Sequence, residues 1–149
     1  MKQIYGPLLG AIVALLIIFP AAAEEDDGIH RLVLQVSDND PEKMTSALNV
    51  AANVSRHYSA IGEEVEIKIL AFNAGINMLI DGTSPVQKRL SSFRPSMPNV
   101  SFLACGNTIN SLARKHGTKP ELLDDVEVVQ AGVVTLMELD KAGWTIVRP

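Results

Sequence analysis

The sequence contains little cysteine, few aromatic residues and no block of clustered positive charge. One cysteine in 149 residues excludes an internal disulfide framework, and three scattered histidines without a second thiol give no recognisable zinc-ligand spacing. The 13 basic and 17 acidic side chains give a formal charge of -4 and a pI near 5.3. We therefore expect no metal site and no nucleic-acid partner.

Two catalytic signatures are also absent. No serine lies in a nucleophile-elbow pattern and no histidine has a motif neighbour, which argues against a serine hydrolase. The glycines form no phosphate-cradling loop, so nucleotide binding has no support. We expect no cofactor, and we expect each histidine to lie at the surface.

The first 23 residues have the pattern of a secretory signal peptide. Lys2 precedes the apolar run Leu8 to Phe19, and small residues follow at Ala21 and Ala23. We expect cleavage after Ala23, which leaves an exported, periplasmic chain of 126 residues with no membrane contact. The alternative is an uncleaved anchor, because residues 4–23 carry no charge and approach the roughly 20 residues that cross a bilayer.

The mature chain is long enough for one domain. Residues 24–29 form an acidic tail, and residues 30–149 contain no internal repeat, low-complexity tract or linker. We therefore predict a single domain over residues 30–149.

Within that domain, strand-like and helix-like segments alternate. Strands are predicted at 31–37, 64–72, 100–105, 126–129 and 144–147, and helices at 41–61, 76–80, 86–93, 107–116 and 131–142. Asp40 and Pro41 should begin the first of these helices and Gly62 should end it, whereas Asn107 or Thr108 should cap the fourth. The strand at 64–72 alternates polar and apolar residues, as a strand near a sheet edge does. The alternation predicts an α/β fold with a five-stranded, mostly parallel sheet and helices on both faces.

In such a sheet, ligands bind at the carboxyl ends of the strands. Cys105 lies there, between a strand end and a helix start, where the helix dipole would lower the pKa of its thiol. Gly106 would let a sulfur donor or a partner's thiol approach closely. The alternative is that Cys105 packs as a small buried hydrophobe. Asp38 and Asp40 could act as an acid and base pair, but turns and helix caps use Asp more often.

Four segments of the sequence resemble the DsrE/DsrF-like sulfur-relay family, and within it the exported, YchN-like members. These are Val33–Ser37 leading to Asp40–Lys43, then Phe72–Gly75, Phe102–Thr108 and Ala142–Trp144. The resemblance implies a three-layer α/β/α sandwich that assembles into homo-oligomers, commonly trimers or hexamers, with pockets near subunit contacts. It also implies that a cysteine after the third strand carries sulfur as a persulfide. Cys105 occupies that position.

From these observations we predict a sulfur carrier that accepts sulfane sulfur on Cys105 and exchanges it with donor and acceptor proteins or small thiols. The residues expected to form the pocket or support the thiolate come from the surrounding loops: Gly106, Asn107, Thr108, Asn73, Gly75, Asp38 and Asn39. One alternative is a non-catalytic oligomeric protein that binds a small ligand or a partner segment in these loops. Another is a redox sensor in which Cys105 pairs across subunits or with a free thiol.

Overall fold

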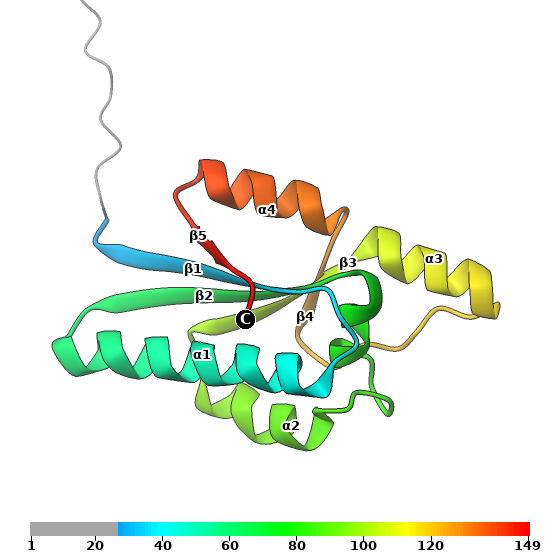
Figure 1. Ribbon diagram of the computed structural model, residues 1–149, viewed down its shortest axis with the longest axis horizontal. Helices are drawn as coiled ribbons and strands as arrows, with labels where there is room; N and C mark the ends of the chain where they lie inside the picture. The colour runs from blue at the N-terminus through cyan, green and yellow to red at the C-terminus, as the bar shows by residue number, and fades with distance from the viewer. Residues whose placement is uncertain (1–26) are drawn as a thin grey trace, which may run out of the picture.

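The computed structural model describes residues 27–149 (Figure 1). Five parallel strands form one sheet in the order β4-β3-β2-β1-β5. The strands are β1 (Ile29–Val36), β2 (Glu64–Ala71), β3 (Val100–Cys105), β4 (Val126–Val129) and β5 (Thr145–Val147). The signal-peptide prediction and most of the acidic tail lie outside the described residues.

Helices lie on both faces of the sheet, which confirms the α/β/α sandwich. The helices are α1 (Pro41–Ile61), η1 (Asn73–Leu79), α2 (Gln87–Ser96), α3 (Gly106–His116) and α4 (Gly132–Lys141). Figure 1 shows α1 and α2 below the sheet, α4 above it, and α3 beyond the carboxyl ends of the strands. Among residues 27–149, no helix has both the length and the apolar character needed to cross a bilayer.

The first helix begins and ends where its sequence predicts. The Asp40 carboxylate accepts hydrogen bonds from the backbone N–H groups of Glu42 and Lys43, at 2.8 and 3.5 Å, so it caps the helix. Gly62 ends the helix in the left-handed region, at φ 76°, which a residue without Cβ adopts at little cost. The Asp40 side chain therefore serves as the N-cap of α1.

The predicted edge position of β2 is wrong, because β2 is the central strand of the five. Its apolar residues Val65, Ile67 and Ile69 lie in the core beneath α1. Glu66 and Lys68 alternate with them and point to the opposite face, where α4 is short and covers only part of the sheet. The Lys68 ammonium lies 5.0 Å from the centroid of the Trp144 ring. The alternation of polar and apolar residues in β2 thus reflects the sparse covering of the sheet on the α4 side.

Three local predictions differ from the structure. The segment predicted as a helix at 76–80 belongs to the 3-10 helix η1, which begins earlier, at Asn73. The helix α2 continues through Pro95 and ends at Ser96, because a proline in the last turn removes only one backbone hydrogen bond. The cap position of α3 is Cys105, with no side-chain hydrogen bond to the helix, so neither Asn107 nor Thr108 caps it.

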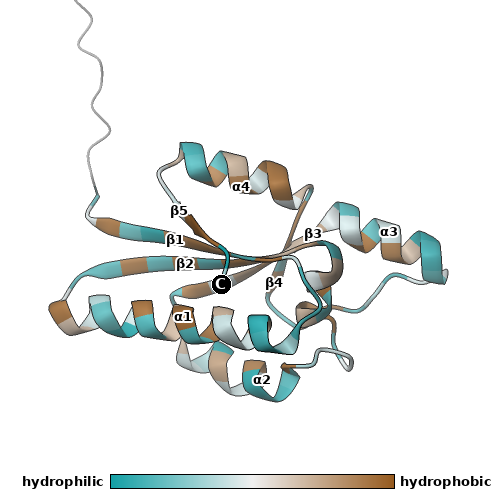
Figure 2. Cartoon of the chain, viewed as in Figure 1, coloured by the Kyte–Doolittle hydropathy of each residue, from teal (hydrophilic) through white to brown (hydrophobic). Residues whose placement is uncertain are grey.

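The sheet separates two hydrophobic clusters of unequal size. Twenty buried residues, from all the elements on the α1 side together with Ile109 of α3, form the larger cluster. Seven buried residues on the α4 side form the smaller cluster: Val33, Leu70, Phe72, Leu103, Cys105, Leu136 and Trp144. Figure 2 shows that apolar residues also occur along α4 and β5, on the thinly covered side. Val133, Val134 and Met137 of α4 are more than half exposed.

Candidate functional site

Cys105 is the last residue of β3 and directly precedes α3. Only 6% of its surface is exposed, yet it lines a pocket of about 540 Å³ at the carboxyl end of the sheet. The pocket lies between α3 and the first turn of α4, and its walls come from three segments of the chain. Its lining residues are Phe72, Asn73, Ala74, Cys105, Asn107, Thr108, Ser111, Leu112, Lys115, Ala131, Gly132, Val133 and Val134.

The sulfur of Cys105 is held by hydrogen-bond donors from two helix starts. The backbone N–H of Gly132, the first residue of α4, donates to Sγ at 3.2 Å. The hydroxyl and the backbone N–H of Thr108, in the first turn of α3, also stabilise negative charge on the sulfur, whereas the backbone N–H of Asn107 donates to the Gln130 carbonyl at 3.1 Å. These donors favour a negative charge on the sulfur, and the dipoles of both helices act in the same direction.

Two opposing effects set the acidity of this thiol. Burial disfavours the thiolate and raises the pKa of Cys105, whereas the Thr108 hydroxyl and the backbone N–H of Gly132 stabilise the thiolate. The hydrogen bonds prevail, and the pKa of Cys105 lies below the ordinary value for a cysteine thiol. The thiolate is the nucleophilic form of cysteine, so the site favours the form that attacks.

The sulfur also takes the place of a helix cap for α4. The residue at the cap position, Ala131, has no side chain that can accept a hydrogen bond, and the first N–H of the helix donates to Sγ instead. A Cβ added at Gly132 would lie 3.1 Å from Leu70 Cδ2 and from Phe72 Cβ, closer than ordinary van der Waals contact. The close approach of α4 to Cys105 therefore favours glycine at position 132.

The Thr108 hydroxyl is itself oriented by the neighbouring loop. The backbone N–H of Asn73 donates to Thr108 Oγ1 at 3.1 Å. Because this hydroxyl oxygen accepts a hydrogen bond from Asn73, its own proton remains available to the sulfur. Asn73 adopts a positive φ of 49°, a conformation that Asn tolerates better than most residues.

The structure brings together four of the eight site residues that the sequence predicts. Cys105, Asn107, Thr108 and Asn73 all line the pocket. Asn39 lines a separate pocket that shares Asn73 with the first, and its Oδ1 accepts a hydrogen bond from the Asn77 amide at 3.0 Å.

Asp38 does not line the Cys105 pocket. Its Oδ2 accepts hydrogen bonds from Lys43 Nζ and from the Arg148 guanidinium, both at 2.8 Å. Lys43 and Arg148 lower the pKa of the Asp38 carboxyl below its ordinary value. This carboxylate therefore joins the start of α1 to the end of the chain, and Asp40 is engaged in capping α1.

Gly75 and Gly106 are needed for backbone packing and do not line the pocket. A Cβ at Gly75 would lie 2.3 Å from the carbonyl oxygen of Val36. A Cβ at Gly106 would lie 3.0 Å from the carbonyl oxygen of Val129, on the β4 side. The expectation that Gly106 opens an approach to the sulfur is therefore wrong, because the space it leaves is filled by the end of β4.

Sequence reasoning missed several residues of the pocket. Gly132 lies in the loop after the fourth strand, but no sequence pattern indicated that its N–H would reach Cys105. Ser111, Leu112 and Lys115 follow Thr108 at intervals of three, four and seven residues, which places them on one face of α3. That periodicity could have identified the α3 wall once Thr108 was chosen.

A second cavity, of about 420 Å³, lies near the amino end of β1. His30 stacks on Tyr58 there, with ring centroids 3.9 Å apart, and its Nε2 lies 2.7 Å from the Glu63 carboxylate. His57 and Thr145 also line this cavity, which contains no thiol. Within residues 27–149, no group of three or more His, Cys, Asp or Glu side chains is arranged to hold a metal ion.

No protein-family model and no curated protein matches the chain. Solved structures with similar folds include the following two. The structure of MTH1491 from Methanobacterium thermoautotrophicum, a protein of unknown function, is 30% identical with a TM-score of 0.61. The crystal structure of YchN from E. coli is 15% identical with a TM-score of 0.59. Each comparison covers 80% of this chain and 99% of the other chain.

The two similarities support statements of different scope. At 15% identity the likeness to YchN, which has a DsrE/DsrF-like fold, concerns the fold alone. The likeness to MTH1491 combines 30% identity with nearly the whole length of that protein. The chain therefore has a DsrE/DsrF-like fold and belongs to the same protein family as MTH1491.

Proposed function

We propose that the protein is a sulfur carrier that holds sulfane sulfur as a persulfide on Cys105. The observation that carries the proposal is the position of Sγ, which lines a pocket and accepts the Gly132 N–H at 3.2 Å. The Thr108 hydroxyl adds a second donor, and the pKa of the thiol is lowered. A thiolate held in this way is suited to attack sulfur and to act again as a leaving group.

The proposed loading step is a displacement at sulfur. The Cys105 thiolate attacks the outer sulfur of a persulfide R–S–SH, so that a bond forms between Sγ and that sulfur. The bond between the two donor sulfurs breaks, and R–S⁻ leaves with the electron pair. The proton stays on the transferred sulfur, giving Cys105–S–SH, and no external oxidant or reductant is consumed. Unloading is the reverse displacement by an acceptor thiolate.

The backbone N–H groups around the sulfur are suited to both stages. In the unloaded state they stabilise the thiolate. In the loaded state the negative charge resides on the outer sulfur whenever the persulfide ionises, and the pocket volume of about 540 Å³ leaves space for that atom. The same donors then lie near the new charge.

The test is intact-mass spectrometry of the folded protein before and after exposure to cysteine persulfide. The proposal predicts a gain of one sulfur, which a thiol reductant reverses. The matched variant, Cys105→Ser, keeps the size and hydrogen bonding of the side chain and should gain nothing. Loading of Cys105→Ser to the same extent, or no loading of the unmodified chain, would contradict the proposal.

A second candidate is a binding protein in which Cys105 only packs, and the 6% exposure of this side chain favours it. The pocket would then hold a small polar ligand on Asn73, Asn107 and Ser111. In that case Cys105→Ala would keep the affinity for the ligand, and Cys105 would resist alkylation until the chain unfolds.

We also propose that the mature chain is exported and forms a homo-oligomer. The exposed apolar residues Val133, Val134 and Met137 give α4 a surface that a second copy could cover. Sedimentation of the purified chain tests the assembly, and Met137→Glu should shift it toward the monomer. N-terminal sequencing of the exported protein tests cleavage after Ala23.

A further inference from the structure

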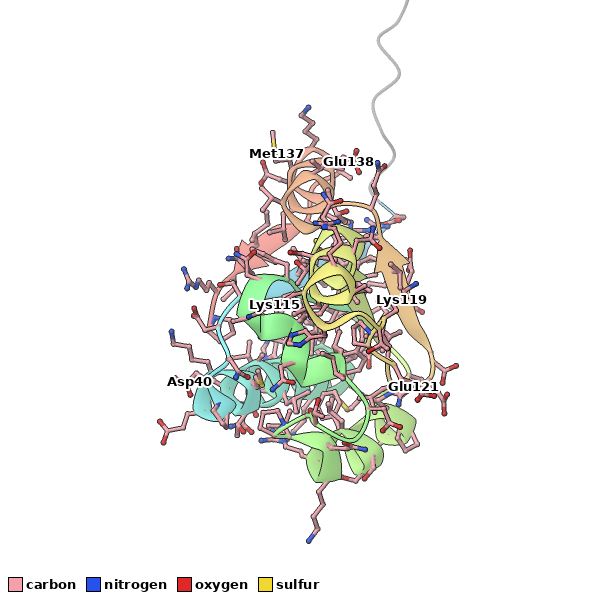
Figure 3. The ribbon with its side chains drawn as sticks, turned by 90° about the vertical axis from the view of Figure 1, so that its right-hand side faces the viewer. Asp40, Lys115, Lys119, Glu121, Met137 and Glu138 are labelled. Carbon is pink, nitrogen blue, oxygen red and sulfur yellow. The ribbon has the colours of Figure 1, made fainter. Side chains whose placement is uncertain are left out.

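The charge around the Cys105 pocket is of one sign. Of the 13 residues that line it, only Lys115 is charged. Arg114 and Lys119 lie close to it in the chain, and no carboxylate occurs between Gly106 and Pro120. Figure 3 looks onto this end of the molecule and shows Lys115 and Lys119 beside the end of α3. We call Arg114, Lys115 and Lys119 the α3 cations.

The α3 cations contrast with the rest of the molecule. The remaining described residues contain nine Lys or Arg and 14 Asp or Glu, a formal excess of five negative charges. All three α3 cations are exposed. No ion pair within residues 27–149 joins any of them to a carboxylate, whereas Arg94, Lys43 and Arg148 all have one.

The chain that follows α3 runs along the η1 side of the molecule. The segment after Pro120 is bound to the η1 side, because the Glu121 carbonyl accepts the Asp81 N–H and the Leu123 N–H donates to the Leu79 carbonyl. Asp125 pairs with Arg94 of α2. In Figure 3, Glu121 lies below Lys119, while α4 with Met137 and Glu138 lies above α3. Lys115 therefore borders the pocket, while Arg114 and Lys119 are exposed to solvent near it in the chain.

We infer that the protein which exchanges sulfur with Cys105 presents its cysteine on an acidic segment that docks on the α3 cations. The inference rests on the proposed function and names the partner of that same site. The donor segment R–S–SH loses its outer sulfur to the Cys105 thiolate and leaves as R–S⁻, as in the loading step above. Carboxylates on the segment bind the α3 cations while its cysteine enters the pocket.

The placement of the cations favours a protein over a small anion. A small anion inside the pocket would meet only Lys115, because Arg114 and Lys119 do not line it. A segment with several carboxylates can contact all three cations at once. Opposite charges across such an interface raise the rate of encounter.

The experiment compares two synthetic peptides as sulfur donors. Each contains one cysteine persulfide, flanked in one peptide by glutamates and in the other by glutamines. At low ionic strength, the glutamate peptide should load Cys105 about tenfold faster or more. Added salt should reduce that difference, because screening lengths fall to about 10 Å at 0.1 M. Equal loading rates at low salt would overturn the inference.

Two triple variants locate the effect. Arg114→Gln/Lys115→Gln/Lys119→Gln should slow the glutamate peptide to the rate of the glutamine peptide. The control Arg56→Gln/Lys88→Gln/Lys141→Gln removes the same total charge from surfaces away from the pocket and should leave the preference in place. If both variants lose the preference for the glutamate peptide to the same extent, the net charge of the protein explains the preference. That result would overturn the docking surface.

Two further measurements separate this inference from the proposed function. The first is the binding of a serine version of the glutamate peptide, followed by fluorescence anisotropy. If the serine peptide binds in a salt-dependent way while the persulfide peptide fails to load Cys105, the docking surface is supported and the sulfur carrier is contradicted. The second uses thiosulfate as a small anionic donor. If Lys115→Gln slows thiosulfate while Arg114→Gln/Lys119→Gln leaves the glutamate peptide unaffected, the pocket takes a small anion and the protein partner is wrong.

Discussion

The two faces of the sheet differ in how well they are covered. On the α1 side, 20 buried residues form one cluster beneath α1, α2 and η1. On the α4 side, seven buried residues form a cluster beneath a single ten-residue helix, and Cys105 is one of them. Burial of apolar surface is the main stabilising term in folding. The α1 side therefore supplies most of the stability, and the α4 side holds the Cys105 thiol.

The two faces also differ in the polar groups that contact them. Within residues 27–149, neither side buries a polar or charged residue completely. On the α4 side, Lys68 lies over Trp144 and the sulfur of Cys105 caps the first N–H of α4. Under the proposed function, a thinly packed face suits a thiol that ionises and takes up a sulfur atom. A close-packed core would not accommodate an added sulfur atom without strain.

The largest expected effect on stability comes from shortening a buried side chain on the α1 side. Leu34 of β1 is fully buried there, and Leu34→Ala should lower the free energy of unfolding by about 3–5 kcal/mol. Its counterpart on the α4 side, Leu136→Ala, should cost about 2 kcal/mol, since fewer neighbours surround Leu136 and they can relax. Denaturant unfolding measures both. An equal or larger loss for Leu136→Ala would contradict the division of roles between the faces.

A change at Gly132 should affect stability and reactivity together. The Cβ of Gly132→Ala would meet Leu70 and Phe72 at 3.1 Å and push α4 away from the sulfur. We expect a loss of about 1–3 kcal/mol and a slower reaction of Cys105 with iodoacetamide at neutral pH. The control Glu138→Gln, at an exposed position further along α4 that does not line the pocket, should preserve the thiol reactivity. A fully stable and fully reactive Gly132→Ala protein would contradict the role of this N–H.

A smaller effect is expected at Thr108. Thr108→Val keeps the shape of the side chain and removes the hydroxyl that stabilises the thiolate, so the pKa of Cys105 should rise. The alkylation rate at neutral pH should fall roughly threefold to tenfold, with little change in stability. The remote control Thr45→Val should leave the rate unchanged. Rates that match between Thr108→Val and the unmodified chain would exclude the hydroxyl from the site.

The smallest effect is the dependence of stability on pH. Because the pKa of Cys105 is lower in the folded chain than in the unfolded chain, the unfolded chain binds more protons between the two values. This contribution is fully present above the unfolded pKa and is lost as the pH falls through the folded pKa. The stability of the unmodified chain relative to Cys105→Ala should therefore increase with pH across that window. A difference that decreases with pH would contradict the sign of the shift.

Most of the fold could be predicted from the sequence, because its signals are local. Asp40, Pro41 and Gly62 mark the ends of α1, and β-branched apolar runs mark the strands. The position of β2 in the sheet was not predictable in this way. Its alternating pattern reports how far helices cover each face, and an exposed face in the middle of a sheet gives the same pattern as an edge.

The candidate site was predictable only in part, for a similar reason. Cys105 and Thr108 are neighbours in the chain, so a strand end followed by a helix start places them together. Gly132 reaches the sulfur from 27 residues away, which depends on the pairing of β3 with β4. The α3 cations lie close together in the sequence, but only the fold shows that α3 ends beside the pocket and that Lys115 lines it. Asp38 was misplaced because its ion pair with Arg148 joins segments 110 residues apart.

The most direct test of the central claim is the alkylation of Cys105 in the folded protein as a function of pH. Iodoacetamide modification would be followed by intact mass, beside the rate of global unfolding under the same conditions. If Cys105 is a reactive thiolate that lines a pocket, its modification should be faster than unfolding. The pH at which the modification rate is half-maximal should lie below about 8.5, the ordinary pKa of a cysteine thiol. Modification that occurs only at the rate of unfolding would show that Cys105 is a core residue and would contradict the account.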